Sequence, residues 1–159
     1  MTLIDKEPVK RVQKILREFD TNSEVIVLKS SARTALEAAK SLNCEVGAIV
    51  KSLLFKTEQN FILCLVAGDK KASLNKIKKI LNMKDISMAS PDDVKNVTGF
   101  TIGGVSPIGH LNKIEILIDP SLRRFDELFA AAGHPNCIFK ISFEDLSKIT
   151  NGSIRELVE

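Results

Sequence analysis

The stretch of sequence that decides the fold lies between residues 49 and 68 and reads IVKSLLFKTEQNFILCLVAG. Two apolar runs within it, Lys51–Lys56 and Phe61–Ala67, have the length of strands, and the polar residues Thr57–Asn60 separate them. Apolar runs joined by a short polar turn predict a β-hairpin. Gly68 follows the second run and ends its strand.

On both sides of this hairpin, capping residues and apolar patterns predict further elements. The clearest helix start is Ser90, because Pro91 and two acids follow it and both are favoured in the first turn of a helix. Thr34 and Glu37 form a capping-box pair. The predicted helices begin near Pro8, Thr34, Ser73, Ser90 and Ser142, and the predicted outer strands are 24–28, 114–118, 128–132 and 137–141.

Helices and strands are thus mixed along the chain without strict alternation. We predict an α/β fold in which a mixed, strongly curved, barrel-like β-sheet is flanked by helices. With 159 residues the chain fits one compact domain, since domains of about 100–150 residues are the commonest, and we assign residues 1–159 to it. A hydrophobic fraction of 44% and a charged fraction of 27% exclude a disordered or collagen-like chain.

The N-terminus and the cysteines predict the compartment. The first residues lack the apolar core of a signal peptide, and no apolar run approaches the ~20 residues that a membrane helix needs. The three cysteines are odd in number and widely spaced, so we expect a reduced, cytoplasmic protein that does not bind membranes. The sequence has no CxxC or HExxH motif and only two histidines, so we expect no metal or other cofactor.

Basic residues are unevenly spread, although the net charge is only +3. Six lysines fall within fifteen positions: Lys70, Lys71, Lys76, Lys78, Lys79 and Lys84. Such a cluster can bind the phosphates of a nucleic acid, and the first five are our candidates for that role. The alternative is an ordinary solvated helix face. Because the chain has no Trp or Tyr, only Phe could stack on bases.

A glycine-rich segment, residues 99–110 (GFTIGGVSPIGH), is the first candidate site. Gly103 and Gly104 can adopt positive φ and Pro107 fixes its own φ, so Gly103–Pro107 can point backbone N–H groups into one concavity that binds a phosphate or an oxyanion. The alternative is a tight structural turn. The spacing fits neither a dinucleotide-binding loop nor a P-loop, and Ser106 is not in a GxSxG elbow.

Lys51 is the second candidate, because it is a lone cation at the start of an apolar strand. Such a lysine extends its amine to solvent, pairs with an acid, or serves a pocket. His134 follows three alanines and a glycine, and it could equally be a turn residue.

Several short segments then occur in a fixed order. They are IVKSLLF from Ile49, VAGD from Val66 before a basic helix, MASP from Met88, TGF from Thr98 running into GGVSPIGH, ID at Ile118–Asp119, and AAGH from Ala131. On these segments the chain resembles the YbaK/prolyl-tRNA synthetase-associated editing-domain family. The likeness covers about residues 34–146.

The resemblance implies a mixed α/β domain that hydrolyses the ester between a wrong, small amino acid and its tRNA, with tRNA for proline as the expected carrier. It implies a free-standing protein, monomeric or weakly dimeric, that acts in trans on aminoacyl-tRNA. Prolyl-tRNA synthetase or the elongation machinery is the further partner that it suggests. The edited amino acid differs among branches of the family, and the sequence does not assign it.

The resemblance also implies roles for particular residues. Lys51 matches the family's essential lysine, expected to hold the phosphate or ribose of the terminal adenosine. The loop residues match the GxxxP loop, whose backbone amides hold the ester carbonyl: Gly103, Gly104, Val105, Ser106 and Pro107. Gly133 and His134 match the segment that closes the amino-acid pocket. Gly109, His110 and Asp119 are further substrate-binding candidates of lower weight, and the lysine cluster would bind the tRNA.

Two other functions remain open at this point. One is a non-catalytic module that binds tRNA or a synthetase through the lysine cluster. The other is a small-ester hydrolase with Ser106 as nucleophile, for which a Ser106, His110 and Asp119 triad can be written from the sequence.

Overall fold

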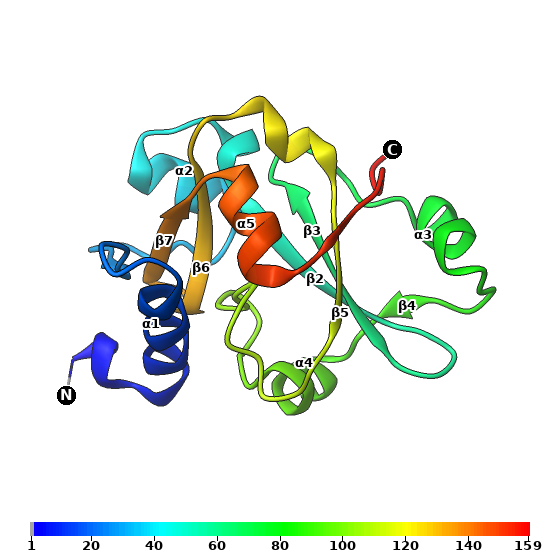
Figure 1. The fold of residues 1–159 in the computed structure, drawn as a ribbon, viewed down its shortest axis with the longest axis horizontal. Coiled ribbons are helices and arrows are strands. Elements are labelled where there is room, and N and C mark those ends of the chain that lie inside the picture. Colours follow the sequence, from blue (N-terminus) through cyan, green and yellow to red (C-terminus); the bar gives the residue numbers. More distant parts are fainter. Residues whose placement is uncertain (1) are drawn as a thin grey trace.

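Two β-sheets and five α-helices make up the fold in the computed structural model, which describes residues 2–159 (Figure 1). The helices are α1 (Glu7–Phe19), α2 (Ala35–Leu42), α3 (Leu74–Leu81), α4 (Pro91–Thr98) and α5 (Phe143–Thr150). The strands are β1 (Ile26–Val27), β2 (Val50–Lys56), β3 (Phe61–Ala67), β4 (Ser87–Met88), β5 (Glu115–Ile118), β6 (Leu128–His134), β7 (Cys137–Ile141) and β8 (Ser153–Ile154).

The predicted hairpin is the centre of the larger sheet. Strands β2 and β3 pair antiparallel, with Val50 opposite Ala67 and Lys56 opposite Phe61. The full strand order is β4-β2-β3-β5-β8, and β3 pairs with β5 in parallel. This sheet is therefore mixed, as the sequence predicts.

The smaller sheet has the order β1-β7-β6 and contains antiparallel pairs. Its hairpin β6–β7 confirms the predicted strands at 128–132 and 137–141, and β6 continues to His134 past an irregularity in the pairing. The strand predicted at 24–28 shortens to Ile26–Val27.

The expected barrel-like sheet is wrong in one respect, because the strands form two sheets that do not close into a barrel. Strand β4 pairs with β2 only at Phe55 and Lys56, so most of that edge of β2 has no neighbouring strand. A single parallel bridge, Ile49 to Phe129, connects this region to β6. The two sheets diverge beyond that bridge.

The predicted helix starts are confirmed by their caps. The hydroxyls of Thr34, Ser73, Ser90 and Ser142 each accept a hydrogen bond from the N–H three residues later, which satisfies a donor that the first turn leaves free. Helix α1 differs, since it begins after Lys6 with Pro8 in its first turn and no side-chain cap.

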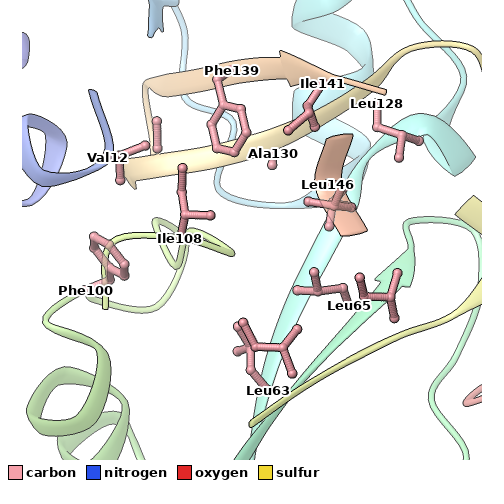
Figure 2. Close-up of a cluster of buried hydrophobic side chains, with 14 of the residues drawn as sticks. Val12, Leu63, Leu65, Phe100, Ile108, Leu128, Ala130, Phe139, Ile141 and Leu146 are labelled. Carbon is pink, nitrogen blue, oxygen red and sulfur yellow. The ribbon is translucent and has the colours of Figure 1, made fainter. Parts of the chain in front are cut away.

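The core fills the space between the two sheets (Figure 2). Leu63 and Leu65 of β3 face Leu128 of β6 and Phe139 of β7 across this space, and all four are fully buried. A second cluster around Phe55 lies on the other face of the larger sheet, beneath α3. None of the helices in residues 2–159 has the length and apolar character needed to cross a membrane.

Candidate active site

A cavity of about 370 Å³ lies where β2 has no neighbouring strand. Strands β2 and β6 line it together with the start of α2, the segment from β4 into α4, and the glycine-rich loop. Its walls are mostly apolar side chains, among them Leu54, Val94 and Ala130. Concave, mainly apolar pockets of about 300–1,000 Å³ are typical of small-molecule sites.

The open edge of β2 gives the cavity main-chain polar groups. The Leu54 carbonyl accepts from Ala89 N–H at 3.0 Å on the side away from β3, whereas the Ile49 carbonyl accepts from Gly68 N–H on the other side. Main-chain groups alternate sides along a strand. The N–H and C=O groups of Ser52 therefore point away from β3 toward the cavity that Ser52 lines, whereas the Val50 end of this edge is taken up by the bridge to Phe129.

Lys51 lies on this wall, a position that fits the third of the alternatives left open by the sequence, a lysine that serves a pocket. Its Nζ donates to the main-chain carbonyl of Lys70, just beyond the end of β3. Burial lowers the pKa of the Lys51 amine, and the nearby Asp69 carboxylate partly opposes that shift. An ammonium has three donors, so one bond to Lys70 leaves two for a ligand.

The Asp69 carboxylate is itself held by Arg124. The two form a double contact, at 2.7 and 3.0 Å. Hydrogen bonding and charge from Arg124 hold the pKa of Asp69 below its usual value. Asp69 thus stays ionised next to the Lys51 amine across the physiological pH range.

The glycine-rich loop supplies the opposite wall. Gly103 and Val105 line the cavity together with Ile102. Gly103 has φ of +94°, which lets the chain turn sharply there, and the N–H of Gly104 donates back to Thr101 at 3.0 Å. In the described part of the chain, no hydrogen bond uses the N–H of Gly103 or of Val105. These two donors are available to a bound molecule.

Gly133 connects the loop to β6. Its N–H donates to the carbonyl of Gly104 at 3.1 Å. A Cβ on Gly104 would lie 2.9 Å from the main-chain nitrogen of His134, so only glycine permits this approach. The sequence predicts Gly104, Gly133 and His134 as site residues, and the structure brings them together directly behind the cavity wall.

The histidines have structural hydrogen bonds. His134 Nδ1 accepts from Asn136 N–H at 3.0 Å within the β6–β7 turn. His110 Nε2 lies 2.7 Å from the Ser106 carbonyl, and it must be the donor because a carbonyl only accepts. Burial lowers the pKa of both imidazoles.

The triad of Ser106, His110 and Asp119, which the sequence left open as an alternative, does not form. Ser106 is fully buried and its hydroxyl accepts from Ile108 N–H at 3.3 Å, while His110 contacts its main chain rather than its hydroxyl. Both Asp119 oxygens accept main-chain N–H groups, from Ser121 and Leu157. Ser106 and Asp119 do not line the cavity.

Other predicted residues also lie away from the cavity. Pro107, Gly109 and His110 form the base of the loop rather than its tip. Lys76, Lys78 and Lys79 lie on α3, which Figure 1 shows at the opposite end of the molecule from α2. Lys70 and Lys71 precede α3; none of the five lines the cavity, but the Lys70 carbonyl contacts the Lys51 amine on its wall. Lys71 pairs with Glu159 at 3.9 Å and Lys76 donates to the Val158 carbonyl at 2.7 Å.

Most of the other cavity residues were not among the predicted site residues, and three of them are notable. Arg33 precedes α2, and its Cγ lies 2.7 Å from where a Cβ on Gly103 would be, so this exposed cation crosses the tip of the loop. Met88 and Ile102 line the cavity yet are 58% and 56% exposed, so they form an apolar rim. Of these three, only Ile102 could have been found from the sequence, because it lies next to the GGVSP motif.

Comparison with known proteins assigns this arrangement to a family. The model of the aminoacyl-tRNA editing domain matches residues 29–149, which include Lys51 and the whole glycine-rich loop. The chain belongs to the aminoacyl-tRNA editing domain family. The resemblance that the sequence motifs indicate is thereby confirmed.

Some proteins resemble this chain over nearly their whole length, and others over only a small part of theirs. The uncharacterized protein YwhH of Bacillus subtilis is 32% identical over 143 residues, 89% of this chain and 90% of that protein. The proline–tRNA ligase of Bacillus velezensis is 31% identical over 121 residues, which are 76% of this chain but only 20% of the ligase. A crystal structure described as a candidate trans-editing enzyme for prolyl-tRNA synthetase has 35% identity and a TM-score of 0.90, and covers 97% of this chain and 98% of that one.

No group of three or more His, Cys, Asp or Glu side chains within residues 2–159 is arranged to hold a metal ion. The polar groups at the cavity are the Lys51 amine, the Arg33 guanidinium, the main chain of the loop and of β2, and the Ser52 hydroxyl. That hydroxyl is buried and has no hydrogen-bond partner among the described residues.

Proposed function

We propose that this editing-domain protein is an aminoacyl-tRNA deacylase that acts in trans, hydrolysing the ester of a small amino acid wrongly attached to tRNA, with tRNA for proline as the expected carrier. The observation that carries the proposal is that Lys51, Gly103 and Val105 line one cavity of about 370 Å³, and that the N–H groups of the two loop residues make no hydrogen bond within residues 2–159. Relatives matched over nine-tenths of their own length support an activity that needs no attached synthetase.

In this proposal water attacks the ester carbonyl carbon. The carbonyl oxygen becomes negative in the transition state, and the N–H groups of Gly103 and Val105 stabilise it. Loss of one such donor costs about 2.7–4 kcal/mol in other enzymes, so main-chain donors alone can account for much of the rate. The ester C–O bond then breaks, the ribose oxygen takes up the proton of the water, and the free amino acid leaves.

Lys51 acts as an anchor rather than as a base. Its ammonium holds a phosphate or ribose oxygen of the terminal nucleotide, which places the ester against the loop. An ester is already activated, so it needs no strong side-chain nucleophile. The buried Ser106 and its bond to Ile108 N–H agree with this scheme rather than with a serine nucleophile.

A separate hydrolytic site for small amino acids removes errors that the amino-acid pocket of a synthetase cannot avoid. One missing methylene changes binding by only about 1–3 kcal/mol, so a synthetase pocket accepts smaller amino acids too often. A hydrolytic cavity walled by Ala130, Ala131 and Val105 would admit the small ones and exclude larger ones by size.

The test is a panel of tRNAs charged with alanine, serine, cysteine and proline. We expect wild-type protein to release at least one of the small amino acids and to spare correctly charged proline tRNA.

The Lys51→Ala variant should lower that rate about 10- to 100-fold, which corresponds to the loss of one charged hydrogen bond. Lys56→Ala is the matched control, because Lys56 ends the same strand but is exposed and lies outside the cavity lining. No release of any amino acid by the wild type would defeat the proposal.

The second candidate is a binding module without turnover. The cluster of Lys70, Lys71, Lys76, Lys78 and Lys79 beside α3 favours it, since such a surface could hold tRNA away from the cavity. Tight, strongly salt-dependent tRNA binding without hydrolysis of any charged tRNA would support this function instead.

A further inference from the structure

One arginine of the N-terminal helix contacts both ends of the glycine-rich loop. Arg11 lies on α1, outside the segment 29–149 that the family model matches. Its Nε donates to the carbonyl of Gly109 at 3.0 Å. One of its terminal nitrogens lies 3.3 Å from the carbonyl of Gly99 and 3.5 Å from that of Thr98.

These carbonyls are the two sides of the loop's base. Helix α4 ends at Thr98 and Gly99, where the loop begins, and Gly109 lies where the chain leaves it. The main chain closes the same base, because Leu111 N–H donates to the Thr98 carbonyl at 3.1 Å. The tip of the loop, with Gly103 and Val105, faces the cavity.

The loop side chains add to this contact. The guanidinium of Arg11 lies 5.1 Å from the centre of the Phe100 ring, which is fully buried. Such a cation over an aromatic face contributes about 0.5–2 kcal/mol. In Figure 2, Phe100 and Ile108 extend from the loop into the core near Val12 of α1. The loop base is therefore packed and hydrogen-bonded against α1.

Helix α1 also approaches the main chain directly. A Cβ on Gly133, which has φ of +93°, would lie 2.9 Å from the carbonyl carbon and oxygen of Pro8. Gly133 in turn donates to Gly104 of the loop tip. Helix α1 thus contacts the loop at its base through Arg11 and, by way of Gly133, at its tip.

We propose that Arg11 is a positioning residue for the deacylation reaction: it fixes the two ends of the loop so that the N–H groups of Gly103 and Val105 are held in place before the substrate binds. This inference rests on the proposed function for its kinetic effect but not for its structural effect. Arg11 touches no cavity-lining residue through these bonds, so it acts through the loop.

The physical reason is preorganisation. Donors that are already aimed at the developing oxyanion need no rearrangement during the reaction, and a misplaced donor loses most of its effect. A guanidinium presents several N–H groups in a rigid plane and can bridge two separate carbonyls. A lysine at the same position presents one compact amine on a flexible stem, without the rigid plane of donors, and would hold the two ends of the loop in a less fixed geometry.

The test compares Arg11→Met and Arg11→Lys with Arg17→Met as the matched control. Methionine keeps much of the apolar stem but makes none of the three carbonyl contacts. Arg17 lies on the same helix with its side chain exposed, and within residues 2–159 its one ion pair is with Glu24, at 3.9 Å. Hydrogen exchange, the titration of His110, thermal unfolding and single-turnover deacylation are measured for all three variants and the wild type.

For Arg11→Met we expect at least tenfold faster exchange of the amides of residues 101–105, while exchange in β2 and β3 stays unchanged. We expect a maximal single-turnover rate at least tenfold lower, with the half-saturating protein concentration changed less than threefold, and an intermediate loss for Arg11→Lys. The pKa of His110 should rise, since the charge of Arg11 contributes to lowering it. Arg17→Met should behave as wild type.

Two outcomes overturn the inference. One is loop exchange in Arg11→Met at the wild-type rate. The other is acceleration of all amides together with a large loss of thermal stability, which would make Arg11 a general stabiliser. Hydrogen exchange and thermal unfolding detect both outcomes without any catalytic activity. If the wild type hydrolysed nothing, the proposed function would be defeated, and the exchange rates of the loop amides would still test whether Arg11 positions the loop.

Discussion

At the scale of the residue, Lys51 carries its positive charge at a position that is partly shielded from water. Burial lowers the pKa of its amine from 10.5, and only Asp69 opposes the shift. The bond to the Lys70 carbonyl holds the amine at the cavity wall before any ligand binds. A lysine in this state is suited to bind an anionic or polar oxygen, but it loses its charge at a lower pH than an exposed lysine.

This predicts a pH dependence of binding. As the pH rises through the lowered pKa of Lys51, the ammonium becomes neutral and the affinity for an aminoacyl-tRNA analogue with an unhydrolysable amide link should fall. Arginine stays charged at these pH values, so Lys51→Arg should bind more weakly at neutral pH but show no loss on the alkaline side. Fluorescence titration between pH 7 and 10 measures both. A wild-type affinity that is flat across this range would contradict the role of the charge.

His110 predicts a pH dependence of stability. Its pKa in the folded protein lies below 6.5, so between the two pKa values the unfolded chain binds a proton that the folded chain rejects. The free energy of unfolding should therefore fall as the pH drops below 6.5, until the folded pKa is passed. His110→Gln keeps a donor for the Ser106 carbonyl but does not titrate, so it should reduce the slope.

Urea unfolding at pH 7.5, 6.5, 5.5 and 5.0 checks this result. The pKa of His134 is lowered too, so His134→Gln is the comparison variant and should remove a separate part of the slope. An unchanged slope in His110→Gln would show that the histidine does not resist protonation in the fold.

At the scale of the element, the glycine-rich loop is held by two neighbours and by bonds of its own. Arg11 of α1 holds its base and Gly104 touches β6, while within the loop the Ser106 carbonyl and hydroxyl are bonded to His110 and Ile108. Its tip alone faces the cavity. The loop is a preformed donor surface rather than a lid.

Gly104→Ala should therefore impair activity more than stability. The added methyl would lie about 3 Å from the main chain of Gly133 and His134, which cannot yield as a side chain can, so the loop must move. We expect at least a tenfold loss of kcat in deacylation assays. Gly152→Ala is the control, since its methyl would meet the Ile118 side chain at 2.8 Å, far from the loop. Equal activity losses in both variants would contradict a specific role for the loop.

At the scale of the whole molecule, the cavity and the lysine cluster occupy different regions. The cavity lies by α2, β6 and the loop, whereas the cluster lies around α3 (Figure 1). Only Lys70 connects them, because its carbonyl holds the Lys51 amine. A tRNA that used both would lie across the larger sheet with its acceptor end at the cavity.

This arrangement predicts separable effects on binding and chemistry. Lys78→Gln with Lys79→Gln should weaken tRNA binding and reduce the slope of log affinity against log salt by about 1 for each lost phosphate contact. The single-turnover rate at saturating substrate should stay the same, since neither residue lines the cavity. Filter binding from 50 to 300 mM salt gives the slope. An unchanged slope would assign these lysines to an ordinary solvated surface.

How much the sequence predicts depends on how local each feature is. Caps such as Thr34, Ser73 and Ser90 are confirmed because each bond spans only three residues. The β2–β3 hairpin is confirmed because only four residues, Thr57–Asn60, separate its two strands. The two-residue strands β4 and β8 escaped prediction, since they are strands only by virtue of distant partners.

The sequence by itself determined the five helices, the longer strands, their order and the two motifs that indicate the family, because these depend on neighbours along the chain. Tertiary structure alone decided that the strands form two sheets, that the edge of β2 stays open beside Lys51, and that Arg33 and Arg11 meet the loop. The physical reason is that the cavity and the contacts of Arg11 with the loop join residues that are far apart in the chain. Whether side chains fill a space or leave it open depends on how all the elements pack together.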